Sequence, residues 1–162
     1  MKLRASTVIA SVFGIGYSPI ASGTVMSAVA ILPAILIAQQ GGAMALFAAS
    51  ILAFAIGILA CDGHLHATGR EDPSECVIDE LAGQWLTCAF SMFTFNGTAA
   101  SLSLPAFILA FFMFRLFDIW KPWPVSWADR ELPGGLGVMT DDMIAGLMAG
   151  ALVALVRYLV PL

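Results

Sequence analysis

The sequence predicts an all-α fold, a compact polytopic membrane bundle of about five main helices with a turn-rich N-terminal segment. Its composition supports this, because 60% of the 162 residues are hydrophobic and only 11% are charged, whereas soluble domains carry about 25% charged residues. Turn signals divide the chain into five apolar pieces, and all but the first have the roughly 17–25 residues that a bilayer requires. The chain length fits a single domain over residues 1–162. The alternative at this composition is a soluble helical domain with an unusually apolar core.

Glycine-rich and polar turns mark where each apolar stretch ends. One such signal at residues 39–42 separates the first stretch from the second, and another at Asn96-Gly97 ends the third. The first stretch is short and contains Pro33, so a full membrane span and a re-entrant segment both remain open for it. The five expected helices are Thr24–Ala38, Ala43–Cys61, Glu75–Phe95, Leu104–Trp120 and Met139–Val160.

The charged residues gather in two clusters, Asp62–Glu80 and Arg115–Asp142, with Lys2 and Arg4 near the N-terminus. Counting helices along the chain places both clusters at one end of the bundle, while the turns at the opposite end lack charge. Only Arg157 falls at that opposite end. Because basic residues favour the cytoplasmic side of a membrane protein, we expect the charged end to face the cytoplasm.

Several other classes of protein do not fit this sequence. A net charge of −4 argues against a nucleic-acid partner. Three widely spaced cysteines form neither a disulfide framework nor a zinc pattern, so we expect them to pack as apolar residues. The close pair His64 and His66 is expected to be surface structure. Gly146 and Gly150 form a GxxxG pair, which lets helix backbones approach closely in lipid.

Two pairs of adjacent carboxylates border apolar helices, Asp79-Glu80 in the first turn of the third helix and Asp141-Asp142 at the start of the fifth. Adjacent carboxylates repel each other, and their burial near lipid is costly. A cation between them relieves both costs, and oxygen ligands suit a hard metal such as Mg²⁺. The alternative is interfacial solvation, because carboxylates also favour helix N-termini. We favour the metal for these two pairs.

Basic residues complement the carboxylates, since a carboxylate-rich site holds a phosphate only through a metal and nearby cations. Arg115, Lys121 and Arg130 supply the cations, and arginine adds bidentate recognition of phosphate. Asp118 lies three residues after Arg115 and shares its helix face. For Arg130, surface solvation is the alternative. The combination indicates metal-assisted phosphoryl transfer to water. The turn-rich segment Gly14–Thr24 is either a connector or a loop whose backbone N–H groups meet an anion.

Three segments together resemble the phosphatidylglycerophosphatase A family along nearly the whole chain. They are Gly14–Thr24 (GIGYSPIASGT), Val77–Gly83 (VIDELAG) and Phe114–Pro124 (FRLFDIWKPWP), the last continuing through Asp129-Arg130 and residues 134–142 (GGLGVMTDD) to Ala145-Gly146. The first segment departs from the usual family pattern. Ser22 replaces a proline there, and Met26 replaces a glycine.

The resemblance implies a Mg²⁺-dependent phosphatase that hydrolyses phosphatidylglycerophosphate to phosphatidylglycerol and phosphate at the cytoplasmic face of a bacterial inner membrane. Its expected partners are this substrate and membrane lipid, and the oligomeric state stays open. The implied metal ligands are Asp79, Glu80, Asp141 and Asp142. The implied catalytic residues are Asp79, Glu80, Asp118 and Asp142, and the implied substrate contacts are Arg115, Lys121, Arg130, Gly14, Gly16 and Thr24.

Two other functions remain possible for the same carboxylates. One is a small cation transporter or channel, although transporter sites usually lie near the bilayer midplane on broken helices rather than at helix ends. The other is a non-catalytic scaffold for enzymes of lipid synthesis. Ion flux without phosphate release would favour the first, and harmless alanine substitutions at the carboxylate pairs would favour the second.

Overall fold

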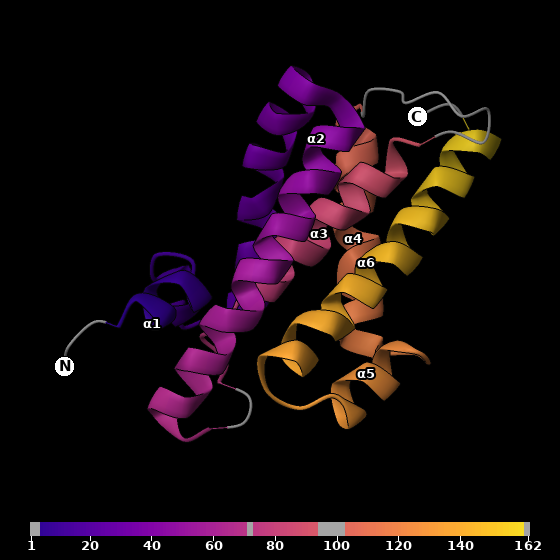
Figure 1. Cartoon of the computed structure of the whole chain (residues 1–162). Coiled ribbons are helices and arrows are strands. Elements are labelled where there is room, and N and C mark those ends of the chain that lie inside the picture. The colour runs from indigo at the N-terminus through magenta and orange to yellow at the C-terminus, as the bar shows by residue number, and fades with distance from the viewer. Residues whose placement is uncertain (1–3, 71–72, 94–102, 161–162) are drawn as a thin grey trace.

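The computed structural model of the chain describes residues 4–70, 73–93 and 103–160, and over these residues it is helical without a β-strand (Figure 1). The all-α expectation is therefore confirmed. Its elements are α1 (Ala5–Ala10), the 3₁₀ turn η1 (Ile15–Tyr17), α2 (Ser22–Thr68), α3 (Ile78–Ser91), α4 (Leu104–Trp120), α5 (Val125–Glu131) and α6 (Gly134–Leu159). The expected helix Leu104–Trp120 is reproduced at both ends by α4.

The long element α2 consists of two arms that fold back on each other at the top of Figure 1. The reversal is at Gly42, whose φ of 68° and ψ of −164° are not helical. A positive φ costs glycine little because it has no Cβ. The predicted break at residues 39–42 is confirmed, although the first arm begins at Ser22 rather than at Thr24. Pro33 lies inside the first arm without ending it.

Several expected helix boundaries were wrong. The second arm of α2 continues to Thr68 instead of ending at Cys61, so the first charged cluster begins on a helix. It ends where Gly69 adopts a left-handed conformation and donates its N–H to the Leu65 carbonyl. The central helix α3 starts at Ile78, three residues later than expected. The same helix ends at Ser91 rather than at Phe95. The expected turn at Asn96-Gly97 lies outside the described residues, as do Lys2, Glu71 and Asp72.

The last helix, α6, begins at Gly134 rather than at Met139. At Gly135, in the first turn of this helix, the absence of a side chain serves packing. A Cβ on Gly135 would lie 2.3 Å from the Ile58 carbonyl oxygen on α2. The short helix α5 was not predicted.

Helix α3 lies at the centre of the bundle and packs mainly against α2 and α6, while α4 packs chiefly against α6. The predicted role of the GxxxG pair is confirmed at the α3–α6 contact. A Cβ on Gly146 would lie 2.6 Å from the Gly83 carbonyl oxygen, and one on Gly150 would lie 3.0 Å from that of Thr87. The Thr87 hydroxyl, 3.2 Å from the Gly146 carbonyl oxygen, donates a hydrogen bond across the same contact. These close approaches hold α3 and α6 side by side.

Among the described residues, two helices are long and apolar enough to cross a membrane, α2 and α6. Length and composition are the only criteria, and core helices of soluble proteins meet them too. The chain runs back and forth along the bundle, so that the end of α2, the start of α3, the end of α4, α5 and the start of α6 lie at one end (Figure 1). These are the elements that carry the two charged clusters. The Gly42 turn and the end of α6 lie at the other end.

Candidate active site

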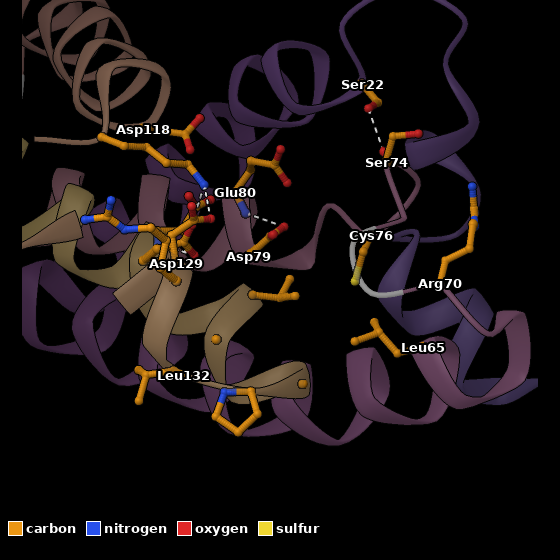
Figure 2. A pocket seen from close by; sticks show the side chains of 18 of the residues that line it. Ser22, Leu65, Arg70, Ser74, Cys76, Asp79, Glu80, Asp118, Asp129 and Leu132 are labelled. Carbon is orange, nitrogen blue, oxygen red and sulfur yellow. Dashed lines mark hydrogen bonds and ion pairs between the residues drawn. The ribbon is translucent and has the colours of Figure 1, made fainter. Parts of the chain in front are cut away.

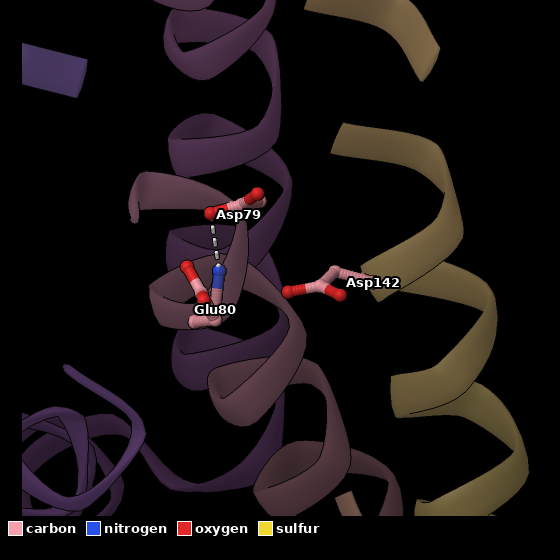
Figure 3. Close-up of side chains that lie close together, drawn as sticks. All are labelled: Asp79, Glu80 and Asp142. Atoms are coloured by element: carbon pink, nitrogen blue, oxygen red, sulfur yellow. Dashed lines mark hydrogen bonds between the residues drawn. The ribbon is translucent and has the colours of Figure 1, made fainter. Parts of the chain in front are cut away.

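Three carboxylates from two helices meet at the charged end of the bundle (Figure 3). Asp79 and Glu80 lie in the first turn of α3, and Asp142 projects toward them from α6. One oxygen from each lies within 4.8 Å of one from each of the others. The close contact of α3 with α6 at Gly83 and Gly146 brings the two helices together next to these residues.

The burial of this group fits a divalent cation. Asp142 is only 3% exposed. Within the described part of the chain, Glu80 Oε2 and Asp142 Oδ2 are buried and have no hydrogen-bond partner. Asp79 accepts one hydrogen bond, from the backbone N–H of Glu80, at 2.9 Å. A buried carboxylate without a partner is expensive unless a positive charge compensates it. Together with an oxygen of Asp79, these two oxygens form a carboxylate donor set that suits Mg²⁺.

The position of Asp142 on α6 differs from the expectation that the acidic pair starts this helix. Because α6 begins at Gly134, Asp141 and Asp142 lie beyond its first turn. The attraction of carboxylates to a helix N-terminus fades within that first turn. The solvation alternative therefore does not account for this pair, whereas it still applies to Asp79 and Glu80 by position alone.

Asp141 does not join the three carboxylates. Its Oδ2 lies 2.9 Å from Nζ of Lys121, which also forms an ion pair with Asp129. Burial by itself lowers the pKa of the Lys121 ammonium, but its hydrogen bonds to Asp129 and Asp141 outweigh this effect and raise the pKa above its ordinary value. Lys121 is therefore a fixed positive charge next to the carboxylates. A metal-ligand role for Asp141 stays a prediction.

Arg115 lies on α4 close to Glu80. Its Nη1 is 2.6 Å from Asp118 Oδ2, and both side chains are 14% exposed. Nη1 also donates to the Ser27 hydroxyl at 3.4 Å. Among the described residues, the buried Arg115 Nε has no hydrogen-bond partner. Arg115 and Asp118 thus form a mostly buried pair near Glu80.

A pocket of about 970 Å³ opens over the carboxylates of Asp79, Glu80 and Asp142 (Figure 2). Two predicted substrate contacts, Lys121 and Arg130, line it, but Arg115 does not. Figure 2 shows Ser22, Ser74 and Arg70 on one side and Asp118 and Asp129 on the other, with Asp79 and Glu80 between them. Arg70 and Ser74 were not singled out from the sequence, because neither belongs to a local motif.

The N-terminal loop reaches the site differently from the prediction. Gly14, Gly16 and Thr24 are not among the residues that line the pocket, although Ser22 is. Gly16 packs so tightly that a Cβ there would lie 2.0 Å from the Glu75 carbonyl oxygen. The described contacts of this glycine therefore serve packing, and substrate binding by Gly14, Gly16 and Thr24 stays a prediction.

Gly23, in the first turn of α2, packs directly against Glu80. A Cβ added at Gly23 would lie 2.0 Å from Glu80 Oε1 and 3.3 Å from Arg115 Nη1. We expect Gly23→Ala to push the Glu80 carboxylate out of place and to lower the rate of phosphate release about a hundredfold, since misplacement by about 1 Å can cost that much. The exposed Ala28 on the same helix provides the control, Ala28→Ser. Equal rates for the two variants would contradict the placement.

A buried histidine was missed by the sequence analysis. His64 is 1% exposed, so the expectation of surface structure was wrong for it, whereas His66 is exposed. The His64 ring joins Thr7 Oγ1 at 3.0 Å to Glu75 Oε1 at 3.3 Å, and Arg70 pairs with the same carboxylate. This network ties α1 and the end of α2 to the segment that leads into α3. No local signal could have revealed the contact with Thr7, which lies 57 residues before His64 in the sequence.

We expect His64→Leu to lower the free energy of unfolding by about 1–3 kcal/mol, because it removes two buried hydrogen bonds and leaves their partners unsatisfied. Thermal denaturation of the detergent-solubilised protein measures this. His66→Leu is the matched control and should change stability by less than about 0.5 kcal/mol, as surface substitutions usually do. A His64 variant as stable as the His66 variant would show that the network contributes nothing.

Comparison with known proteins decides the family. The sequence model described as phosphatidylglycerophosphatase A matches residues 8–157. The chain belongs to the phosphatidylglycerophosphatase A family. The phosphatidylglycerophosphatase A of Escherichia coli (strain K12) is 32% identical over 151 residues, covering 93% of this chain and 82% of that protein. That of Haemophilus influenzae is 30% identical over 146 residues, covering 90% of this chain and 85% of the relative.

A third relative carries a different name. A Bacteroides thetaiotaomicron protein, provisionally named a phosphatidylinositol-3-phosphatase, is 32% identical over 158 residues, covering 91% of each chain. No solved structure matches the chain. The predicted resemblance to the phosphatidylglycerophosphatase A family is confirmed, and with it the predicted class of enzyme, a phosphoric monoester hydrolase.

Proposed function

We propose that this protein hydrolyses phosphatidylglycerophosphate to phosphatidylglycerol and phosphate, with Mg²⁺ as its cofactor. The observation that carries the proposal is the group Asp79, Glu80 and Asp142, drawn from two helices of a phosphatidylglycerophosphatase A family member. The substrate named for two bacterial relatives is the one we assign to this chain.

The carboxylates and the cations around them have complementary tasks. Asp79, Glu80 and Asp142 would hold the metal ion, which when bound polarises the phosphate and lowers the pKa of an attacking water. Lys121, which lines the pocket next to Asp141, offers a fixed positive charge to the phosphate oxygens. Arg115 is held by Asp118 behind Glu80 and adds positive charge to a site that otherwise repels an anion.

We place the protein in the bacterial inner membrane as a multi-pass protein with its pocket at the cytoplasmic face. Large apolar side chains are exposed on the outer faces of α2, α4 and α6, among them Leu36, Leu59, Phe112 and Leu155. Exposed apolar surface of this kind marks contact with lipid or a partner. The basic side chains Arg70, Arg115, Lys121 and Arg130 lie at the pocket end, which by the positive-inside rule is the cytoplasmic end.

The deciding experiment measures phosphate release by the purified protein from phosphatidylglycerophosphate, with Mg²⁺ and with EDTA. We expect release with Mg²⁺, none with EDTA, and recovery when Mg²⁺ is returned. Phosphatidylinositol 3-phosphate is the comparison substrate because of the name of the Bacteroides relative. Faster release from that lipid would overturn the substrate assignment, and release that persists in EDTA would overturn the metal.

A further inference from the structure

Three of the four tryptophans lie close together in sequence, in the short segment between the end of α4 and the middle of α5, which also contains the pocket residue Lys121. Trp120 is 69% exposed, Trp123 78% and Trp127 46%. The fourth, Trp85, is only partly exposed and donates its ring N–H to the Ala30 carbonyl at 2.9 Å. Folding gains little from leaving three such large rings in contact with water, so their exposure requires a partner.

Their surroundings identify the kind of partner. Tryptophan favours the boundary between water and lipid, because its ring is amphipathic and fits at the level of the lipid headgroups. Above Trp120, α4 presents the exposed apolar side chains of Ile119, Leu116, Phe112 and Ile108, which suit hydrocarbon. Lys121 and Arg130, which lie in and next to the same segment, suit anionic headgroups. The order of apolar side chains, then tryptophans, then basic residues matches the order of hydrocarbon, interface and anionic headgroups in a membrane.

The lengths of the helices place the carboxylates at the base of the pocket a short way below this boundary. Tyr158, near the far end of α6, is 65% exposed and is a second aromatic residue suited to a boundary. From Asp142 to Tyr158, α6 is about 24 Å long at 1.5 Å per residue. A hydrocarbon core of about 30 Å therefore puts Asp142 about one helical turn inside the near boundary. Helix α4, with 17 residues, is about 25 Å long and carries Trp120 at its near end.

We propose that Trp120, Trp123 and Trp127 form an interfacial anchor, which lies among the lipid headgroups and holds the mouth of the pocket at the depth of a lipid phosphate. This rests on the membrane location given under the proposed function, but not on the chemistry. With the mouth held there, a lipid reaches the three carboxylates without leaving its leaflet. The anchor thus suits an amphiphilic substrate whose acyl chains stay in the bilayer.

The test uses single-tryptophan proteins in phosphatidylcholine vesicles, with the other tryptophans replaced by phenylalanine. One protein keeps Trp123, and the matched reference carries Phe112→Trp, which lies about 12 Å farther along α4 than Trp120 and is also exposed. Lipids brominated near the headgroup or near the chain end then quench the fluorescence. We expect shallow bromines to quench Trp123 more strongly than deep ones, and the opposite order for the Phe112→Trp reference.

Three results would overturn the anchor. Trp123 could be quenched by aqueous iodide and by neither lipid, which means that it projects into water. It could be shielded from both, which means that a second copy of this chain covers it. Deep bromines could quench Trp123 more strongly than shallow ones, as expected for the Phe112→Trp reference, which means that this segment is buried in hydrocarbon. Each of these is read without any measurement of phosphatase activity.

An activity measurement separates the anchor from the proposed chemistry. We expect the double variant Trp123→Ser and Trp127→Ser to lose activity on phosphatidylglycerophosphate in vesicles but to keep it on a short-chain, water-soluble analogue. Equal activity on both substrates would overturn the anchor and leave the phosphatase intact. Failure of the unmodified protein on both substrates would overturn the phosphatase and leave the fluorescence result standing.

Discussion

We expect Asp142→Asn to lower the proposed Mg²⁺-dependent phosphate release roughly a thousandfold. Asp142 is the only one of the three grouped carboxylates contributed by α6. A metal ion acting on a phosphate supplies several kcal/mol of transition-state stabilisation, and each loss of about 1.4 kcal/mol lowers the rate tenfold. The rate at saturating Mg²⁺ and the half-saturating Mg²⁺ concentration measure the effect.

The same substitution should have the opposite effect on stability without metal. In EDTA, Asp142 lies buried next to Asp79 and Glu80, so removing its charge relieves repulsion. Asp142→Asn should therefore melt at a higher temperature than the unmodified protein in EDTA, and added Mg²⁺ should no longer raise its melting temperature. Asp129→Asn, whose carboxylate pairs with Lys121 away from the three, is the control and should keep the stabilisation by Mg²⁺. A loss of activity with the Mg²⁺ response unchanged would contradict metal binding by Asp142.

Gly146→Val separates the two helices that bring the carboxylates together. The Cβ at this position would lie 2.6 Å from the Gly83 carbonyl oxygen, which is closer than the backbone of α3 can tolerate. Overpacking of this kind costs about 1–3 kcal/mol. Because the contact adjoins Asp142, we expect phosphate release and the Mg²⁺-dependent rise in melting temperature to be lost together. Thermal denaturation with and without Mg²⁺, alongside the activity assay, measures both.

Ala151→Val adds the same side chain to the exposed face of α6 and should change neither property. This control separates the effect of a bulky β-branched residue in a helix from the effect of the close approach at Gly146. If Gly146→Val retained full activity and stability, the spacing of α3 and α6 would not be what assembles the site.

The helices and the end of the bundle that carries the site followed from local signals. Apolar runs bounded by glycine or polar turns predicted α4 at both ends and the reversal at Gly42, because turn chemistry acts over a few neighbouring residues. The distribution of charge along the chain predicted that Asp79, Glu80 and Asp142 would lie at the same end. Helix ends depend on neighbouring residues, and the end of the bundle that carries the charges depends on the order of the helices along the chain. Both could therefore be predicted without a structure.

The tertiary structure decided which of two neighbouring carboxylates points into the site. Asp141 and Asp142 are indistinguishable as a sequence pair, but successive residues on a helix face different directions. Asp142 therefore faces α3, while Asp141 reaches Lys121. The hydrogen bond of His64 with Thr7 and the contact of Gly23 with Glu80 likewise arise only when segments distant in sequence pack together. No local pattern encodes such contacts, because their energies depend on the whole arrangement of the helices.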